Sequence, residues 1–431
     1  MIQALRNAFR LPDLRRRILV TFLILIIYRL AAHVPLPNIK TELLADVFAK
    51  NQLLSLLDMF SGGAMSSFSV MAMGVYPYIT ATIVMQLLQP IIPALENLAK
   101  EGEAGRNKLN QYTYFLTIPL CALSAFGLGM QMQAQGVATN FGLSGSALLP
   151  TVTTIITMTA GTMFAIWLGE LITERGIGQG LSIIILGGIV ARIPQRVGAL
   201  ITTDLRGLIV FLIITAITVL VIVVVQEGQR RIPVQYGKRV LAMRGNRLRI
   251  AGGQSTHIPL RVNSAGMIPL IFAQSIMMFP GVIASYFLSS GVPWIKTAAT
   301  SVYNLFNTQS TVYWIMYFFM VVGFTYFYTD VIFQQQDLAG NLKRQGGFIP
   351  GKRPGKRTED YLNGVLRRIT LVGAVFLGAV AILPWLVKGV TETSTMLITS
   401  SGLLIVVGVV LDTLRQLEAQ LVMRHYEGFI K

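Results

Sequence analysis

Apolar residues gather in ten long stretches along the chain, and shorter polar connections separate them. Each stretch is close to the roughly 20 residues that an α-helix needs to cross a bilayer. The pattern predicts an all-α polytopic membrane protein. Its ten transmembrane helices are expected at residues 18–38, 70–93, 111–133, 151–172, 179–197, 207–226, 263–288, 312–333, 365–387 and 395–412.

Basic residues fall almost entirely into alternate connections. The N-terminal tail, every second connection and the C-terminal tail hold 28 of the 36 Lys and Arg residues, and the other set holds seven. Lys and Arg are retained on the cytoplasmic side of membrane proteins. Both termini and the two long basic loops, residues 227–262 and 334–368, are therefore predicted to be cytoplasmic.

Composition agrees with this class of protein. Apolar residues make up 53% of the chain and charged residues 13%, whereas soluble proteins carry about 25% charged residues. The net charge of +17 lies in loops at a membrane face, so contact with anionic lipids is expected. Cys121 is the only cysteine, which excludes an intrachain disulfide. No cleavable signal peptide is expected ahead of the first span.

The second and seventh stretches are poor candidates for purely lipid-facing helices. Both combine Gly and Pro with amide side chains, namely Gly74, Pro77 and Gln86 in the second and Gly266, Pro269 and Gln274 in the seventh. They occupy corresponding positions if the chain consists of two five-helix repeats. Paired interrupted helices of this kind indicate a transport pathway. The alternative is that Gly and Pro are simply common in transmembrane helices.

Three segments outside the spans have distinctive patterns. Residues 60–69 are rich in small side chains and too short to span a membrane, which predicts either a weakly held, mobile element or an ordinary outer loop. Residues 231–236 and 247–250 alternate apolar and polar side chains, which predicts a β-hairpin that turns at 244–246. Residues 346–357 are basic and rich in Gly and Pro, which excludes a regular helix.

No enzyme site is recognisable. Residues 346–352 resemble a phosphate-binding loop, but Arg353 stands where Ser or Thr would bind magnesium, and Pro350 lacks an amide donor. The three histidines, at positions 33, 257 and 425, lie far apart in the topology. We expect no enzymatic activity, cofactor or metal.

Charged residues within the membrane are almost absent. All 19 Asp and Glu residues fall in loops or at span ends, whereas ion-coupled carriers usually keep carboxylates at mid-membrane. Arg29 is the one charge deep in a span, and we expect it to reach the interface or to pair with backbone carbonyls.

Seven short motifs occur in order among the ten spans. They lie at residues 60–64, 77–81, 167–178, 229–234, 262–269, 348–355 and 426–428. Together they resemble the SecY family, the pore subunits of the bacterial protein-translocation channel, over essentially the whole chain. Two departures stand out: Thr399-Ser400-Ser401-Gly402 replaces the usual Gly-Gly-Thr-Ser, and Leu171 replaces a customary Gln.

The resemblance implies two inverted five-helix halves, residues 1–200 and 201–431, around a central pore. The apolar ring of the pore would be Val75, Ile79, Leu181, Ile185, Ile271 and Ile405. A plug beneath it would cover residues 60–69, including Phe60, Ser61, Gly62, Gly63, Ala64, Met65, Ser66 and Ser67. A lateral gate between the second and seventh spans would carry Thr80, Gln86 and Asn263.

The resemblance also implies a function and partners. The expected function is a channel in the bacterial plasma membrane that conducts unfolded secretory chains and releases apolar segments, such as signal sequences, sideways into lipid. The SecA motor or a ribosome would dock on the cytoplasmic loops, and the small membrane subunits SecE and SecG would complete the complex. The docking residues would be Arg230, Arg231, Lys238, Arg239, Lys352 and Arg353.

The gate amides suggest how opening is controlled. Gln86 and Asn263 are expected to bridge the closed gate by hydrogen bonds of about 0.6 to 2 kcal/mol. Loss of such a bridge, by replacement of either residue with Leu, would then let less hydrophobic signals open the gate.

Two other functions stay open from the residues alone. One is a weakly coupled small-solute carrier with inverted repeats, which would show a saturable solute flux. The other is a membrane insertase or scaffold without a continuous pore. Ion conductance after deletion of residues 60–69 would argue against that function.

Overall fold

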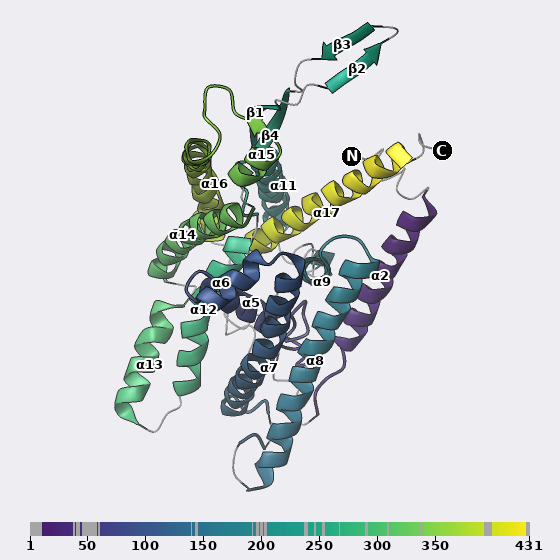
Figure 1. Ribbon diagram of the computed structural model, residues 1–431. Coiled ribbons are helices and arrows are strands. Elements are labelled where there is room, and N and C mark those ends of the chain that lie inside the picture. Colours follow the sequence, from purple (N-terminus) through teal and green to yellow (C-terminus); the bar gives the residue numbers. More distant parts are fainter. Residues whose placement is uncertain are drawn as a thin grey trace.

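Each of the ten apolar stretches contains a helix in the computed structural model of the chain (Figure 1). The ten helices are α2 (Pro12–Ala31), α5 (Tyr76–Leu88), α7 (Glu103–Ala134), α8 (Leu148–Arg175), α9 (Gly180–Val190), α11 (Leu205–Glu227), α12 (Ile268–Phe287), α14 (Thr311–Gln336), α16 (Lys356–Thr391) and α17 (Thr399–Glu427). Shorter helices are α6 (Pro93–Lys100), η1 (Gly145–Ala147), α13 (Pro293–Leu305) and α15 (Leu338–Arg344).

The structure describes most of the chain. The described residues are 11–37, 39, 44, 58, 61–138, 140–142, 145–191, 193–194, 198, 201, 205–236, 240–244, 247–251, 255–266, 268–288, 292–307, 310–336, 338–391 and 399–427. Phe60, Lys238 and Arg239, which the sequence predicts as plug and docking residues, lie outside them.

Helix lengths differ between the spans. Within the described residues, α7, α8, α14 and α16 are each long and apolar enough to cross a membrane, and α5 with α6 forms a further pair bent by 104°. Helix α5 has only 13 residues, which gives about 20 Å of the roughly 30 Å hydrocarbon core. The predicted second span is therefore only partly helical.

The predicted span begins at residue 70, but the residues before α5 form turns that the rest of the protein covers. Gly74 has a φ of 52°, in the left-handed region, and Pro77 lies in the first turn of α5, so the helix begins only at Tyr76. None of residues 61–75 is exposed. Non-helical backbone at membrane depth is tolerated only where protein or water surrounds it. The sequence places this backbone inside the protein.

Helix contacts fall into two groups. In one group α5 packs on α7, α7 on α8, α8 on α9, and α2 on both α8 and α9. In the other α12 packs on α14, α14 on α16, and α17 on both α11 and α16. The groups meet where α9 contacts α17 and where α12 contacts α5 and α7. A central hydrophobic core draws side chains from both groups.

The outer surface of the helices is apolar. Large hydrophobic side chains such as Phe22, Phe115, Leu220 and Phe319 are each more than 60% exposed. Exposed apolar surface on this scale needs a nonaqueous neighbour, which agrees with lipid contact around the helices.

Strands form a separate unit at one end of the molecule, together with the two chain ends that Figure 1 marks. Strand β1 (Gln229–Tyr236) pairs antiparallel with β4 (Ser255–Arg261) on one side and with β5 (Gly347–Phe348) on the other. Strands β2 (Val240–Arg244) and β3 (Arg247–Ala251) form a second ladder. Helix α13 and the connection between α7 and α8 lie at the opposite end.

One prediction about these strands is wrong. The chain reverses between Arg244 and Arg247 as predicted, but residues 231–236 pair with β4 and not with residues 247–250. The physical reason is burial: Ile232 and Val234 belong to a small core with Leu342 and Leu362, and β4 contributes Leu260 to that core. The loop is thus two successive ladders.

Candidate functional site

The six predicted ring residues meet in one place. Val75, Ile185, Ile271 and Ile405 belong to the central hydrophobic core, and Ile79 and Leu181 are half-buried and pack against it. The four core members are at most 8% exposed. Side chains from α5, α9, α12 and α17, together with Val75 at the start of α5, therefore close the centre of the helix assembly with aliphatic carbon.

Close backbone approach positions the α9 part of this ring. A Cβ atom added to Gly169 on α8 would lie 2.6 Å from Cδ2 of Leu181, and one added to Gly180 would overlap the carbonyl of Gly169. Two glycines thus let α8 and α9 touch, and Leu181 packs over the bare backbone of α8. Leu181, Ile185 and Gly188 are spaced to share one face of α9.

The segment predicted as the plug folds as a compact turn. The Asp58 carboxylate accepts the backbone N–H of Ser66 at 2.8 Å, and the Ser61 hydroxyl donates to the Asp58 carbonyl at 3.1 Å. Ser66 and Ser67 hydroxyls donate to the carbonyls of Gly63 and Ala64 at 2.9 and 3.1 Å. Small side chains and serine hydroxyls together let the backbone turn tightly and stay hydrogen-bonded.

This turn lies directly against the ring helix. A Cβ atom added to Gly62 would lie 2.8 Å from Cα of Gly188 on α9, so the two backbones are in contact. Gly188 shares its helix face with Leu181 and Ile185, and it lies toward the C-terminal end of α9. Residues 61–69 are therefore packed on that side of the ring.

Arg29 contacts the same turn. Its guanidinium donates a hydrogen bond to the carbonyl oxygen of Gly62. The expectation that Arg29 would pair with backbone carbonyls is confirmed.

A polar cavity of about 270 Å³ lies on the other side of the ring. Gln179 and Ser182 of the α9 region, Arg261 of β4, and Asp412 and Arg415 of α17 are among its lining residues. Arg415 donates to Glu227 at 2.8 Å and lies 3.6 Å from Asp412. The cavity is therefore lined by charged and polar side chains, whereas the neighbouring ring is aliphatic.

The predicted gate residues lie where the two helix groups meet, but they do not form the expected bridge. The Thr80 hydroxyl donates to the Tyr76 carbonyl of its own helix, and the Asn263 amide donates to the Gly266 carbonyl at 2.9 Å. Asn263 precedes α12 and lies close to Gly373 of α16. Oε1 of Gln86 and Oδ1 of Asn263 are both buried without a partner in the described part of the chain.

Among the described residues, three further buried side-chain oxygens on the neighbouring helices have no hydrogen-bond partner. They belong to Gln274, Ser275 and Tyr317. A buried polar atom without a partner costs about 1–3 kcal/mol. Such atoms are rare in proteins and each calls for an explanation. The contact between α5, α12 and α14 therefore contains polar groups that exposure to water would satisfy.

The predicted docking residues that the structure describes lie on the strand unit and beside it. Arg230 and Arg231 are exposed on β1, and Lys352 lies 5.2 Å from the ring centre of Tyr361. Arg353 is exposed, while its carbonyl accepts the Thr358 hydroxyl at 2.8 Å. Because β5 joins β1, the loops at residues 227–262 and 334–368 meet in one unit, which we call the platform and which consists of β1, β4, β5 and α15.

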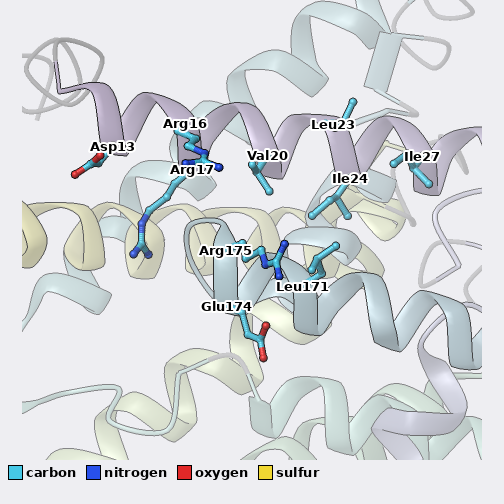
Figure 2. A pocket seen from close by; sticks show the side chains of 10 residues that line it. All are labelled: Asp13, Arg16, Arg17, Val20, Leu23, Ile24, Ile27, Leu171, Glu174 and Arg175. Carbon is cyan, nitrogen blue, oxygen red and sulfur yellow. The ribbon is translucent and has the colours of Figure 1, made fainter.

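A groove of about 560 Å³ separates α2 from α8 near the same end (Figure 2). Arg16 and Arg17 stand toward one end of the groove and Ile24 and Ile27 toward the other, while Arg175 faces them from α8. The groove thus combines basic and aliphatic walls. Within the described residues, no three His, Cys, Asp or Glu side chains gather so as to hold a metal ion.

These features define a class: a polytopic membrane channel whose closed constriction is aliphatic and which carries no catalytic constellation in its described part. Comparison with known proteins agrees. The SecY family model matches residues 69–414, and the chain belongs to the SecY family. It is a non-enzymatic subunit of the Sec translocase and a protein-conducting channel. This membership decides against the solute-carrier and scaffold alternatives.

The chain is similar to curated relatives over its full length. It is 42% identical to the protein translocase subunit SecY of Thermotoga maritima over 447 residues, covering 100% of this chain and 98% of the relative. It is 43% identical to the same subunit of Halalkalibacterium halodurans over 446 residues, covering 100% of both.

Solved structures share the fold. A SecY structure that describes how the plug domain stabilises the closed state of the channel has a TM-score of 0.62 at 17% identity, covering 95% of this chain and 92% of that one. Canine Sec61 in a ribosome-channel complex has a TM-score of 0.61 at 16% identity, covering 95% and 93%.

Several functional contacts escaped the sequence analysis. Gly62 and Gly188 are 126 positions apart, and no local pattern pairs them. Tyr28 is an ordinary aromatic residue in an apolar span. Only the isolated charge of Arg29 gave a signal, because a cation at that depth requires a partner.

Proposed function

We propose that this chain passes unfolded secretory polypeptides through the aliphatic ring of Val75, Ile79, Leu181, Ile185, Ile271 and Ile405. The convergence of these six side chains at the centre of the helix assembly carries the proposal. An extended chain in hydrocarbon would expose unsatisfied amides, each costing several kcal/mol. A water-filled path removes that cost, and a narrow aliphatic ring dewets and blocks ions when idle.

Residues 60–69 are the plug in this proposal, and the halves 1–200 and 201–431 separate to open the channel. The contact of Gly62 with Gly188, on the outer side of the ring, supports the plug assignment. The few contacts between the helix groups, α9 with α17 and α12 with α5 and α7, support the motion.

Crosslinking of a stalled substrate tests the path. A Cys121→Ala background receives Ile79→Cys or Ile271→Cys, and a precursor with one cysteine is stalled midway through export in reconstituted vesicles. We expect disulfides at both positions, because both side chains border the proposed path.

Ile217→Cys is the matched control, because Ile217 is 58% exposed on the outer face of α11 and should not crosslink. Efficient export without crosslinks at positions 79 and 271 would refute the assigned ring.

Gate opening gives a second test. A hydrogen bond between Gln86 and Asn263 would predict that Gln86→Leu opens more easily, whereas the contacts of Gln86 predict the opposite effect. Gln86 and Asn263 are not bonded to each other, and Oε1 of Gln86 is buried without a partner in the described part of the chain. Gln86→Leu removes this unsatisfied atom from the closed state. We therefore expect the variant to demand a more hydrophobic signal, with several-fold slower export of a substrate that has a weak signal.

Export assays of one substrate with a graded series of signal sequences measure this effect. Thr82→Val on the same helix is the control, because its hydroxyl donates within α5 to Tyr78. Faster export of weak-signal substrates by Gln86→Leu would contradict the proposal.

We further propose the partners of the channel. The exposed arginines on the platform support docking of SecA and of a ribosome, whose phosphates attract basic loops. The basic groove between α2 and α8 supports contact with anionic lipid headgroups at the cytoplasmic face of the bacterial plasma membrane. SecE and SecG complete the complex, and both termini are cytoplasmic.

A further inference from the structure

The outer end of the first span holds the plug through two side chains. Tyr28 is among the largest fully buried side chains in the described part of the chain and is 1% exposed. Its hydroxyl donates to the carbonyl oxygen of Ser61 at 3.0 Å. Arg29, the next residue, donates from its guanidinium to the carbonyl oxygen of Gly62. Two consecutive residues of α2 thus bind two consecutive plug carbonyls.

The chain that follows α2 extends this attachment. The Ser67 hydroxyl donates to the Ala32 carbonyl at 3.1 Å. The Leu36 N–H donates to Phe68 and the Val70 N–H to Val34, both at 3.0 Å. These bonds pair the far end of the plug with the first outer connection, and Pro35 lies opposite Ser69 in an antiparallel bridge.

The two attachments differ in what plug displacement would require. The backbone pairs at residues 34–36 lie just beyond the last turn of α2, where the connection can move together with the plug. Tyr28 and Arg29 belong to α2 itself, which packs on α8 and α9. The plug can leave Gly188 only when the bonds to Tyr28 and Arg29 break.

Arg29 is a cation within the first span. A charge within a span is costly and normally marks a functional site. Here the guanidinium satisfies a carbonyl of Gly62, whose φ of 67° favours glycine at that position. A charged donor gives a stronger hydrogen bond than a neutral one.

We propose that Tyr28 and Arg29 form a latch that holds the plug in the closed channel and that a translocating chain must release. This inference rests on the proposed plug assignment. Once the latch is released and the channel opens, water reaches the guanidinium of Arg29 from the outer side, so its charge is solvated in the open state. The latch thereby sets how easily the idle channel opens.

The test measures idle ion conductance of the full chain with its partner subunits in planar bilayers. Tyr28→Phe deletes only a hydroxyl, and Arg29→Met deletes the donors while keeping a long side chain. We expect the open-state population to rise several-fold for Tyr28→Phe and roughly 10- to 100-fold for Arg29→Met. Arg29→Lys, which retains a charged donor, should restore most of the closure.

A second readout follows the plug directly. Ala64→Cys, in a Cys121→Ala background, is buried when the plug is seated, because Ala64 is 0% exposed, so the latch variants should raise its rate of reaction with a water-soluble thiol reagent. Lys296→Met and Tyr303→Phe on α13 are matched controls, because they remove a cation and a hydroxyl elsewhere on the outer side.

The outcomes separate the latch from the plug. Deletion of residues 61–67 should open the channel whether or not the latch exists, and an unchanged conductance after that deletion would refute the plug assignment. If the deletion opens the channel while Tyr28→Phe and Arg29→Met keep wild-type conductance and the wild-type rate of thiol modification at Ala64→Cys, the latch is refuted.

Discussion

Replacing Arg353 with Glu is expected to abolish SecA-driven export and to leave the channel folded. Arg353 is exposed and lies beyond β5, the strand that joins the two cytoplasmic loops. The backbone around it is held by the bond from Thr358, a residue 2% exposed, to the Arg353 carbonyl. A rigidly presented guanidinium suits planar, bidentate contact with a carboxylate on a docked motor. Glu reverses that charge.

ATP-dependent export by reconstituted vesicles measures this prediction. Arg353→Lys should also lose most of the activity, because an ammonium group cannot form the bidentate contact. Arg357→Glu is the charge-matched control, since this residue is equally exposed in the first turn of α16. Normal export by Arg353→Glu would rule out the proposed docking role.

Adding one methyl group at position 188 is expected to open the idle channel. The new Cβ of Gly188→Ala would overlap Cα of Gly62, and both atoms belong to backbone that cannot rotate away. Either the plug or α9 must shift, and either movement loosens the contact between Gly62 and α9. We expect a large rise in ion leak, by an order of magnitude or more if overpacking costs about 1–3 kcal/mol.

The neighbouring residue provides the control. A Cβ added to Gly187 would lie 3.0 Å from Cδ2 of Leu25, the flexible end of a side chain. Gly187→Ala therefore gains the same helix propensity, about 1 kcal/mol, without disturbing the plug. Ion flux through vesicles with each variant distinguishes them. Equal flux through the two variants would show that the contact between Gly62 and Gly188 does not hold the channel closed.

The length of α5, the helix in the second predicted span, shows what the apolar pattern of the sequence does not determine. Apolarity predicts a span at residues 70–93, but the helix covers only Tyr76–Leu88. Gly74 and Pro77 explain where α5 begins. They do not reveal that residues 61–75 fold back into the protein, because a buried turn requires neighbours that supply its covering surface. That surface comes from α2, α7, α8 and α9.

The platform is a second example. Alternation in residues 231–236 predicts a strand, and β1 is there. Its partners are β4 and β5, and β5 comes from a loop more than 100 residues further along the chain. Strand β1 pairs with these partners because Ile232 and Val234 then pack in the core around Leu342. Such complementarity is a property of packed surfaces.

By itself, the sequence determined the class of protein, the places of the ten helices and the concentration of basic residues in alternate connections. These properties depend on local apolarity and on the distribution of charge, which each segment carries independently of its neighbours. Family motifs added the names of the ring, plug and gate residues.

Only the tertiary structure decided which apolar residues face the centre, how α2 contacts residues 61–67, and that Gln86 and Asn263 are not bonded to each other. Every apolar side chain in a span satisfies the membrane equally well, so composition cannot distinguish Ile405 from a lipid-facing residue. The distinction arises when helices distant in sequence pack together, because close contact between specific surfaces selects one arrangement among many that are equally apolar.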